Sequence, residues 1–165
     1  MTPAAPSPQP PPPPDSPRTM RILVVSDVHY ASPAEKARRG YESHAIRSRL
    51  LRLAVTAYRH HFWLRDPFAH NLLLDDFLAR AGDADLVIGN GDYSCDTGFV
   101  GVSDDAAAES AALCLGRLRA AWGDRFQPVL GDHELGKFSI FGACGGFRLA
   151  SWDRCVGEFG FELAR

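Results

Sequence analysis

Five side chains of metal-binding type directly follow three short apolar stretches of the sequence. Asp27 and His29 follow ILVVS, Asp92 follows VIGNG, and Asp132 and His133 follow PVLG. Carboxylate oxygens combined with imidazole nitrogens are ligands that suit divalent Mn, Fe or Zn. If the apolar stretches are strands that end at one edge of a sheet, these side chains share a single divalent-metal site.

The elements that must position these side chains alternate between strands and helices. The stretches 21–26, 85–90 and 126–131 are short, apolar and bounded by Gly or Asp, which is typical of strands buried on both faces. Helical spacing of apolar residues predicts helices over 71–82 and 103–123. This order favours right-handed crossovers and a mainly parallel sheet, in which ligands bind at the carboxyl ends of the strands. The sequence therefore predicts an α/β fold with the three acidic turns at one edge.

Both predicted helices carry recognisable end signals. Gly82 stands where the C-terminal cap of the first helix is expected. In the second helix Ser103 is the expected N-cap, aspartates follow in the first turn, and Gly123 marks the end. The apolar face of the first helix consists of Leu73, Leu74, Phe77, Leu78 and Ala81.

The spacing of Asp27 and His29 favours a shared cation. The two residues are two positions apart, so on a strand-like backbone their side chains point to the same side. The alternative for any one turn is that its aspartate caps a helix or forms the turn itself. Three such turns in register favour the metal site over this alternative.

The three motifs resemble those of the calcineurin-like metallophosphoesterase family over about residues 20–135. Asp27-Val28-His29 matches the family's DxH motif and Gly91-Asp92 its GD motif, while residues 131–134, GDHE, are similar to its GNH[ED] motif. The resemblance implies a four-layer α/β/β/α sandwich with two divalent metal ions, for which we expect Mn, Fe or Zn.

The resemblance also implies a role for each matched residue. Asp27, His29 and Asp92 would bind the first metal, Asp92 would bridge to the second, and Asp132 would bind the second. His133 would be the catalytic residue, contacting the phosphate or assisting the leaving oxygen. Two cations about 3.5–4 Å apart activate a water and hold the phosphoryl oxygens, so the expected activity is hydrolysis of a phosphomonoester or phosphodiester.

Two features depart from the family pattern. Asp132 replaces the family's asparagine, and the extra negative charge would lower the Lewis acidity of the metals and repel an anionic phosphate. No histidine follows His133, whereas the family completes its metal sites with later histidines. We therefore expect the N-terminal portion of a longer domain or a degenerate copy, with the sandwich incomplete at the C-terminus.

These departures leave two functions open. A complete enzyme of this pattern hydrolyses a phosphate ester, although we expect residues 1–165 alone to be nearly inactive. The alternative is a catalytically inactive metal-binding or interaction module that keeps the scaffold and uses a basic amphipathic helix.

That helix is predicted over residues 44–64, within the most basic part of the sequence. Residues 30–65 hold eight Lys and Arg against Glu35 and Glu42. In one interpretation the helix covers the sheet and exposes its arginines to solvent. In the other it lies on an anionic membrane surface with Phe62 and Trp63 as anchors. The face expected to be apolar consists of Ile46, Leu50, Leu53, Ala57 and His61.

Composition sets the class of protein. With 165 residues, 45% hydrophobic and 23% charged, the chain fits one soluble globular domain, and its net charge of -2 gives no indication of a nucleic-acid partner. Four irregularly spaced cysteines predict reduced thiols rather than a zinc knuckle or disulfide scaffold. Because neither a membrane-spanning run nor a signal peptide is recognisable, the expected location is cytoplasmic.

The first residues form a separate region of the sequence. Residues 1–19 hold nine of the twelve prolines, which predicts an extended, solvated tail ahead of a metallophosphoesterase region over 20–165. Met20 directly precedes the first predicted strand, so translation starting there is a further hypothesis.

Overall fold

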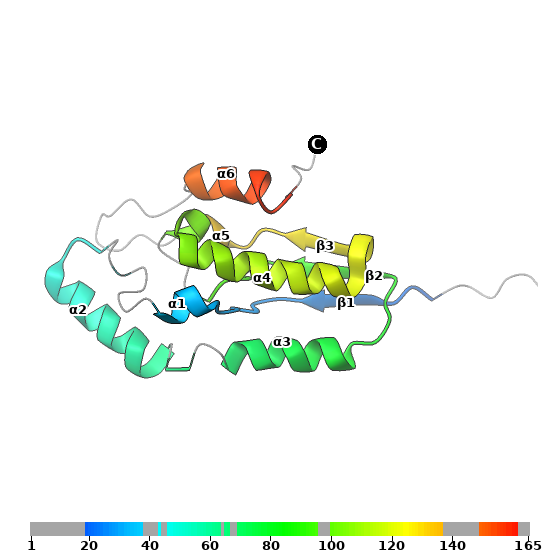
Figure 1. The fold of residues 1–165 in the computed structure, drawn as a ribbon, viewed down its shortest axis with the longest axis horizontal. Coiled ribbons are helices and arrows are strands. Elements are labelled where there is room, and N and C mark those ends of the chain that lie inside the picture. The colour runs from blue at the N-terminus through cyan, green and yellow to red at the C-terminus, as the bar shows by residue number, and fades with distance from the viewer. Residues whose placement is uncertain are drawn as a thin grey trace, which may run out of the picture.

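A parallel three-stranded sheet forms the centre of the computed structural model, which describes residues 19–37, 43, 46–63, 65–66, 69–95, 100–136 and 149–161 (Figure 1). The strands are β1 (Ile22–Val25), β2 (Leu86–Asn90) and β3 (Phe126–Val129), in the order β1-β2-β3. Val24 pairs with Ile88, and Ile88 pairs with Gln127, so all three strands end at the same edge. The predicted α/β class and the predicted strands are confirmed.

Helices connect and cover the strands. They are α1 (Pro33–Ala37), α2 (Arg49–Tyr58) with its π-helical extension η2 (Arg59–Trp63), α3 (Ala69–Arg80), η3 (Gly101–Ser103), α4 (Asp105–Trp122), η4 (Gly123–Arg125), α5 (Asp132–Leu135) and α6 (Leu149–Gly157). Figure 1 shows α4 running along the sheet and α3 alongside β1. No helix among the described residues is long and apolar enough to cross a membrane.

The core lies between α4 and one face of the sheet. Val87 on β2 and Phe126 on β3 are buried against Leu115, Leu118 and Trp122 of α4. Burial alternates along β1 and β2, so the opposite face is more open. The expectation that the strands are buried on both faces is therefore wrong for the described part of the chain, because only one face has a packed helical layer. The exposed side chains of the open face include Ile22, Val24 and Val129.

The helix boundaries agree with the expected glycine signals and differ at one cap. Gly82 takes a left-handed φ of 64° two residues after α3 ends, and Gly123 caps the C-terminus of α4. The N-cap of α4 is Asp104, whose Oδ1 accepts a hydrogen bond from the backbone N–H of Ala107 (3.1 Å), and not the predicted Ser103. Ser103 instead lies in η3 and donates its hydroxyl to the carbonyl of Val100.

The basic helix differs from its prediction in length and in orientation. It begins at Arg49 with Ser48 as N-cap, and none of the residues of α2 is buried. Ile46, which precedes the helix, forms a small cluster with Val100, against which Leu51 and Val55 pack. The prediction that this helix covers the sheet is therefore wrong. Helix α2 attaches through Leu51 and Val55, and it packs on Ile46 and Val100.

The remaining predictions concern cysteines and the tail. Cys95, Cys114 and Cys155 are buried and Cys144 lies outside the described residues, so the expected reduced state stays a prediction. Burial raises the pKa of both the Cys114 and the Cys155 thiol to about 12, which keeps them protonated. Residues 1–18 of the predicted tail also lie outside the described residues.

Candidate metal centre

The two loops that follow β1 and β2 run side by side. His29 donates its backbone N–H to the carbonyl of Asp92 (2.9 Å), and Tyr30 donates to the carbonyl of Tyr93 (2.8 Å). Tyr30 and Ser94 form an isolated parallel bridge. These bonds extend the parallel pairing past the strand ends, so His29 is held beside Asp92.

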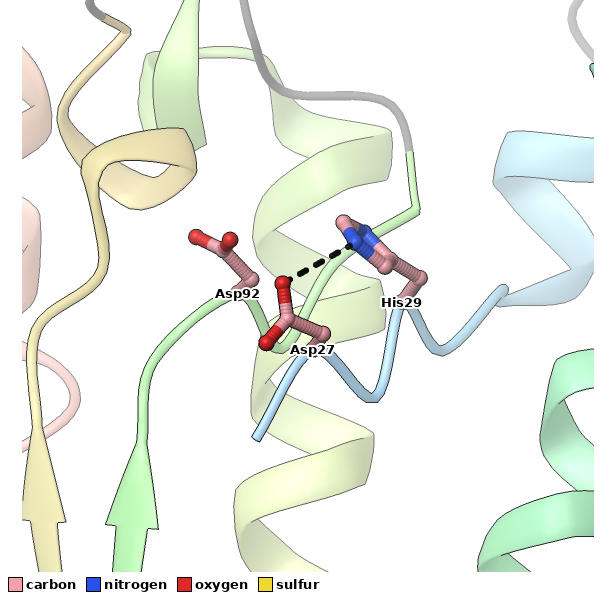
Figure 2. A group of neighbouring side chains, drawn as sticks. All are labelled: Asp27, His29 and Asp92. Atoms are coloured by element: carbon pink, nitrogen blue, oxygen red, sulfur yellow. Dashed lines mark ion pairs between the residues drawn. The ribbon is translucent and has the colours of Figure 1, made fainter. Parts of the chain in front are cut away.

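Asp27, His29 and Asp92 converge because of turns and not because of strand alternation. β1 ends at Val25, and Asp27 (φ 54°), His29 (φ 48°) and Asp92 (φ 57°) all have a left-handed backbone. The strand-based reason for their common direction is therefore wrong, although the convergence itself is found. Figure 2 shows the three side chains, with Oδ1 of Asp27 4.0 Å from Nε2 of His29.

Strained backbone is concentrated at these three residues. Among the described residues they are the non-glycine residues with positive φ. Such a conformation costs about 1–3 kcal/mol per residue and is retained mainly where function requires it. These left-handed turns bring the three side chains together, but they do not by themselves exclude the turn-forming role of the aspartates, because Asp tolerates this conformation in turns.

The predicted site residues form two groups that share one carboxylate. Asp27, His29 and Asp92 each offer a ligand atom within 4.8 Å of the others, and so do Asp92, Asp132 and His133. The rings of His29 and His133 are 5.2 Å apart between centroids. All five predicted residues are thus brought together, and His133 has a geometry that suits a ligand as well as a catalytic residue.

The chemistry of this donor set fits divalent transition metals. Both groups combine carboxylate oxygen with imidazole nitrogen, as Mn, Fe and Zn sites do. Burial, followed by the nearby His133, lowers the pKa of His29. A lowered pKa favours the neutral imidazole, which is the form that coordinates a metal.

Glu134 connects the loops that carry the two groups. Its carboxylate is fully buried and accepts hydrogen bonds from the backbone N–H groups of Asp92 (2.9 Å), Tyr93 (2.7 Å) and Gly131 (2.9 Å). Burial raises the pKa of this carboxyl, while the three backbone hydrogen bonds oppose that rise. This role of Glu134 is not evident from the three motifs, although a Glu three residues after a helix N-cap is a known capping signal.

Two glycines allow these loops to approach each other. A Cβ atom on Gly91 would lie 2.3 Å from Cα of Gly131, and one on Gly131 would lie 2.3 Å from Oδ1 of Asp92. Both distances are far below van der Waals contact. The glycines of the GD and GDHE motifs therefore permit this close approach.

His70 also reaches this region, from α3. Its Nδ1 lies 3.3 Å from the carbonyl oxygen of His29, and the two rings are 6.2 Å apart. The order of the motifs did not suggest this, because His70 comes before the second motif in the sequence. It is the fold, and not the order along the chain, that brings His70 close to His29. A cavity of about 270 Å³ next to it is lined by Asp27, Val24, Val28, Leu73, Leu74 and Phe77.

Of the comparisons with known proteins, the one with family models agrees with the three motifs. Neither the curated proteins nor the solved structures gave a match. A family model described as calcineurin-like phosphoesterase matches residues 20–164, which extends beyond the last of the three motifs to almost the end of the sequence. The chain therefore belongs to the calcineurin-like phosphoesterase family.

Proposed function

We propose that the protein hydrolyses a phosphomonoester or phosphodiester with two divalent metal ions. Membership of a phosphoesterase family supports metal-dependent hydrolysis of a phosphate ester in general. The observation that carries the more specific proposal is the sharing of Asp92 between two groups of ligand type. A carboxylate with two oxygens can contact two cations and fix their separation.

Each residue has a distinct task in this proposal. Asp27, His29 and Asp92 hold the first metal, and Asp92 and Asp132 hold the second. When bound, the metals supply an activated water and charge stabilisation for the phosphoryl oxygens. His133 donates a proton to the leaving oxygen, and its backbone N–H donates to Oδ1 of Asp92 (3.2 Å), which orients that carboxylate.

Asp132 favours a second function, that of a metal-binding module without catalytic activity. This carboxylate adds a third negative charge to those of Asp27 and Asp92, which favours metal binding but disfavours the approach of an anionic phosphate. A protein that binds metal without turnover is the expected result if this repulsion dominates.

The cytoplasmic location also stays a prediction from the sequence.

Metal titration with a bridging-residue variant tests the proposal. Calorimetry with Mn²⁺ should give two ions per chain for the native protein and fewer for Asp92→Asn, because the amide cannot bridge with two charged oxygens. Asp76→Asn, at an exposed aspartate of α3, is the matched control and should leave the stoichiometry unchanged. Equal stoichiometry and affinity in the Asp92 variant would rule out the two-metal proposal.

An activity assay then separates the enzyme from the metal-binding module. p-Nitrophenyl phosphate and bis(p-nitrophenyl) phosphate, each with Mn²⁺, report on monoester and diester hydrolysis. The enzyme proposal expects turnover that EDTA abolishes and Mn²⁺ restores, and such turnover would overturn the near-inactivity expected from the sequence for residues 1–165 alone. Two bound metals without turnover on either ester would favour the module.

A further inference from the structure

Large apolar side chains are unusually exposed along α2 and η2. Leu50 is 82% exposed, Leu53 is 69% exposed and Phe62 is 75% exposed. Leu50 and Leu53 are three residues apart and therefore neighbours on one helix face, which the small side chains of Ala54 and Ala57 continue. An apolar strip of this kind is costly in water and is typical of a surface that binds a partner.

The attachment of α2 to the rest of the molecule uses the other face. Leu51 and Val55 pack on the cluster of Ile46 and Val100. The guanidinium of Arg52 donates two hydrogen bonds to the carbonyl of Ile46 (3.0 and 2.7 Å). The helix is therefore fixed by one side, and the exposed strip is a consequence of that orientation.

The charge within residues 46–63 has one sign. Residues 46–63 contain four arginines, Arg47, Arg49, Arg52 and Arg59, and no Asp or Glu. Arg47 and Arg49 are exposed next to Leu50, while Arg52 is directed at the Ile46 carbonyl. The exposed leucines suit a partner with an apolar interior, and the exposed arginines beside them suit anionic groups at the surface of that partner.

We propose that α2 and η2 dock on an anionic phospholipid surface. Leu50, Leu53 and Phe62 enter the boundary between headgroups and acyl chains, and Arg47 and Arg49 contact lipid phosphates. A second copy of the chain is a poorer occupant, because pairing two such helices would bring like-charged arginines together. Nucleic acid would leave the exposed leucines in water.

The position of α2 gives the docking a defined orientation. In Figure 1 α2 lies at the end of the molecule toward which the strands run, and the loops of the metal centre follow the carboxyl ends of those strands. Docking through α2 therefore turns the end that carries the metal centre toward the lipid. The docking itself does not depend on the proposed hydrolysis.

Vesicle flotation with the full chain tests the proposal. We expect binding to vesicles of phosphatidylcholine with 30% phosphatidylserine at low salt, and release as added salt screens the arginines. Leu50→Asp with Leu53→Asp should lower the partition coefficient more than about tenfold, because both side chains lose their apolar burial. Arg47→Gln with Arg49→Gln should lower it about fivefold for each arginine removed.

Matched controls distinguish docking from a general loss of solubility or fold. Leu72→Asp replaces a leucine of α3 that is 66% exposed, and Arg80→Gln replaces an exposed arginine of the same helix. Both should bind vesicles like the native chain, and all variants should keep the native circular dichroism spectrum because the replaced side chains are exposed.

Three outcomes would overturn the proposal. The first is an absence of binding to the phosphatidylserine vesicles at low salt. The second is equal binding by the Leu50/Leu53 variant and the native chain. The third is sedimentation equilibrium that shows a dimer broken by the Leu50/Leu53 change, together with no lipid binding, which would identify a second copy of the chain as the occupant.

Discussion

Glu134 is the residue that holds the candidate metal centre together. Its carboxylate accepts the backbone N–H of Asp92 and of Gly131. Those two bonds join the loop after β2 to the loop after β3. Because Asp92 takes part in both ligand groups, a shift of its backbone would disturb both groups at once. We therefore regard Glu134 as a positioning residue.

Glu134→Gln is predicted to weaken metal binding as well as folding. In the Gln side chain only the oxygen accepts hydrogen bonds, whereas both oxygens of Glu134 accept them. At least one backbone N–H therefore loses its acceptor, which lowers the free energy of unfolding by about 1–3 kcal/mol. We expect Mn²⁺ affinity of the folded variant to fall about tenfold, as is typical for residues that orient a ligand. Calorimetry well below the unfolding temperature measures this affinity.

The control for that variant is Glu109→Gln, at an exposed position in the middle of α4. It should change neither stability nor Mn²⁺ affinity. If Glu134→Gln lowered only the stability and left the affinity at the native value, Glu134 would have a structural role without positioning Asp92.

His133 is predicted to act on the leaving group, and the choice of ester tests this. Loss of a proton donor should slow hydrolysis of alkyl phosphates about 10²–10⁴-fold, but slow nitrophenyl phosphates much less, because nitrophenolate leaves without protonation. The His133→Ala variant should still bind two Mn²⁺ ions. His60→Ala, at an exposed histidine of η2, is the control. A fall in metal stoichiometry would assign His133 to the second metal instead.

At the scale of elements, α6 supports the segment of Val100 and η3, which packs against α5. Oγ of Ser151 accepts the backbone N–H of Ser103 (3.0 Å) and donates to the carbonyl of Val100 (3.1 Å). Gly101 lies so close that an added Cβ would be 2.4 Å from the carbonyl oxygen of Glu134 and 2.5 Å from Oγ of Ser151. Helix α6 thus packs against the same short segment that packs against α5.

Removing the cap of α4 is predicted to destabilise the fold. Asp104→Ala deletes the side-chain acceptor for the N–H of Ala107, so the free energy of unfolding should fall by about 1 kcal/mol. Urea unfolding followed by circular dichroism measures the change. Glu109→Ala, in the interior of the same helix, should stay within about 0.5 kcal/mol of the native chain. An equal loss in both variants would show that the Asp104 cap contributes nothing specific.

The elements were more predictable than their contacts. Strands and helices α3 and α4 follow from short apolar runs and helical spacing, which are local properties of the sequence. The orientation of α2 does not, since spacing favoured the face of Leu50 and Leu53, whereas Leu51 and Val55 pack on the cluster that contains the distant Val100. Glu134 was missed for the same reason, because two of its three donors lie in a loop about forty residues earlier.

The metal centre could be predicted in its members but not in its geometry. Motif order identified Asp27, His29, Asp92, Asp132 and His133. The left-handed backbone of the first three could not be foreseen, because this conformation is uncommon for non-glycine residues and depends on the surrounding loop. In this protein those bonds join the loops after β1 and β2.

At the scale of the whole molecule, the two faces of the sheet differ in burial. Helix α4 and the core residues cover one face, on which Val87 is 0% exposed. The opposite face carries Val24 on the neighbouring strand, which is 60% exposed. Both residues are valines in the same three-stranded sheet, so the same substitution at each compares the two faces directly.

Val87→Ala should destabilise the protein far more than Val24→Ala. Deleting two buried methyl groups removes apolar burial and leaves a cavity beside α4, for an expected loss of about 2 kcal/mol in the free energy of unfolding. The same deletion at Val24 removes side-chain area that is already mostly in water, so we expect a loss of about 0.5 kcal/mol or less. Urea titrations of both variants, with equal m-values, give the comparison. A loss at Val24 as large as that at Val87 would mean that the open face is covered in solution, either by a further part of the protein or by another copy. Sedimentation velocity of the native chain would then distinguish these two forms of cover, because only the second makes the sedimentation coefficient depend on concentration.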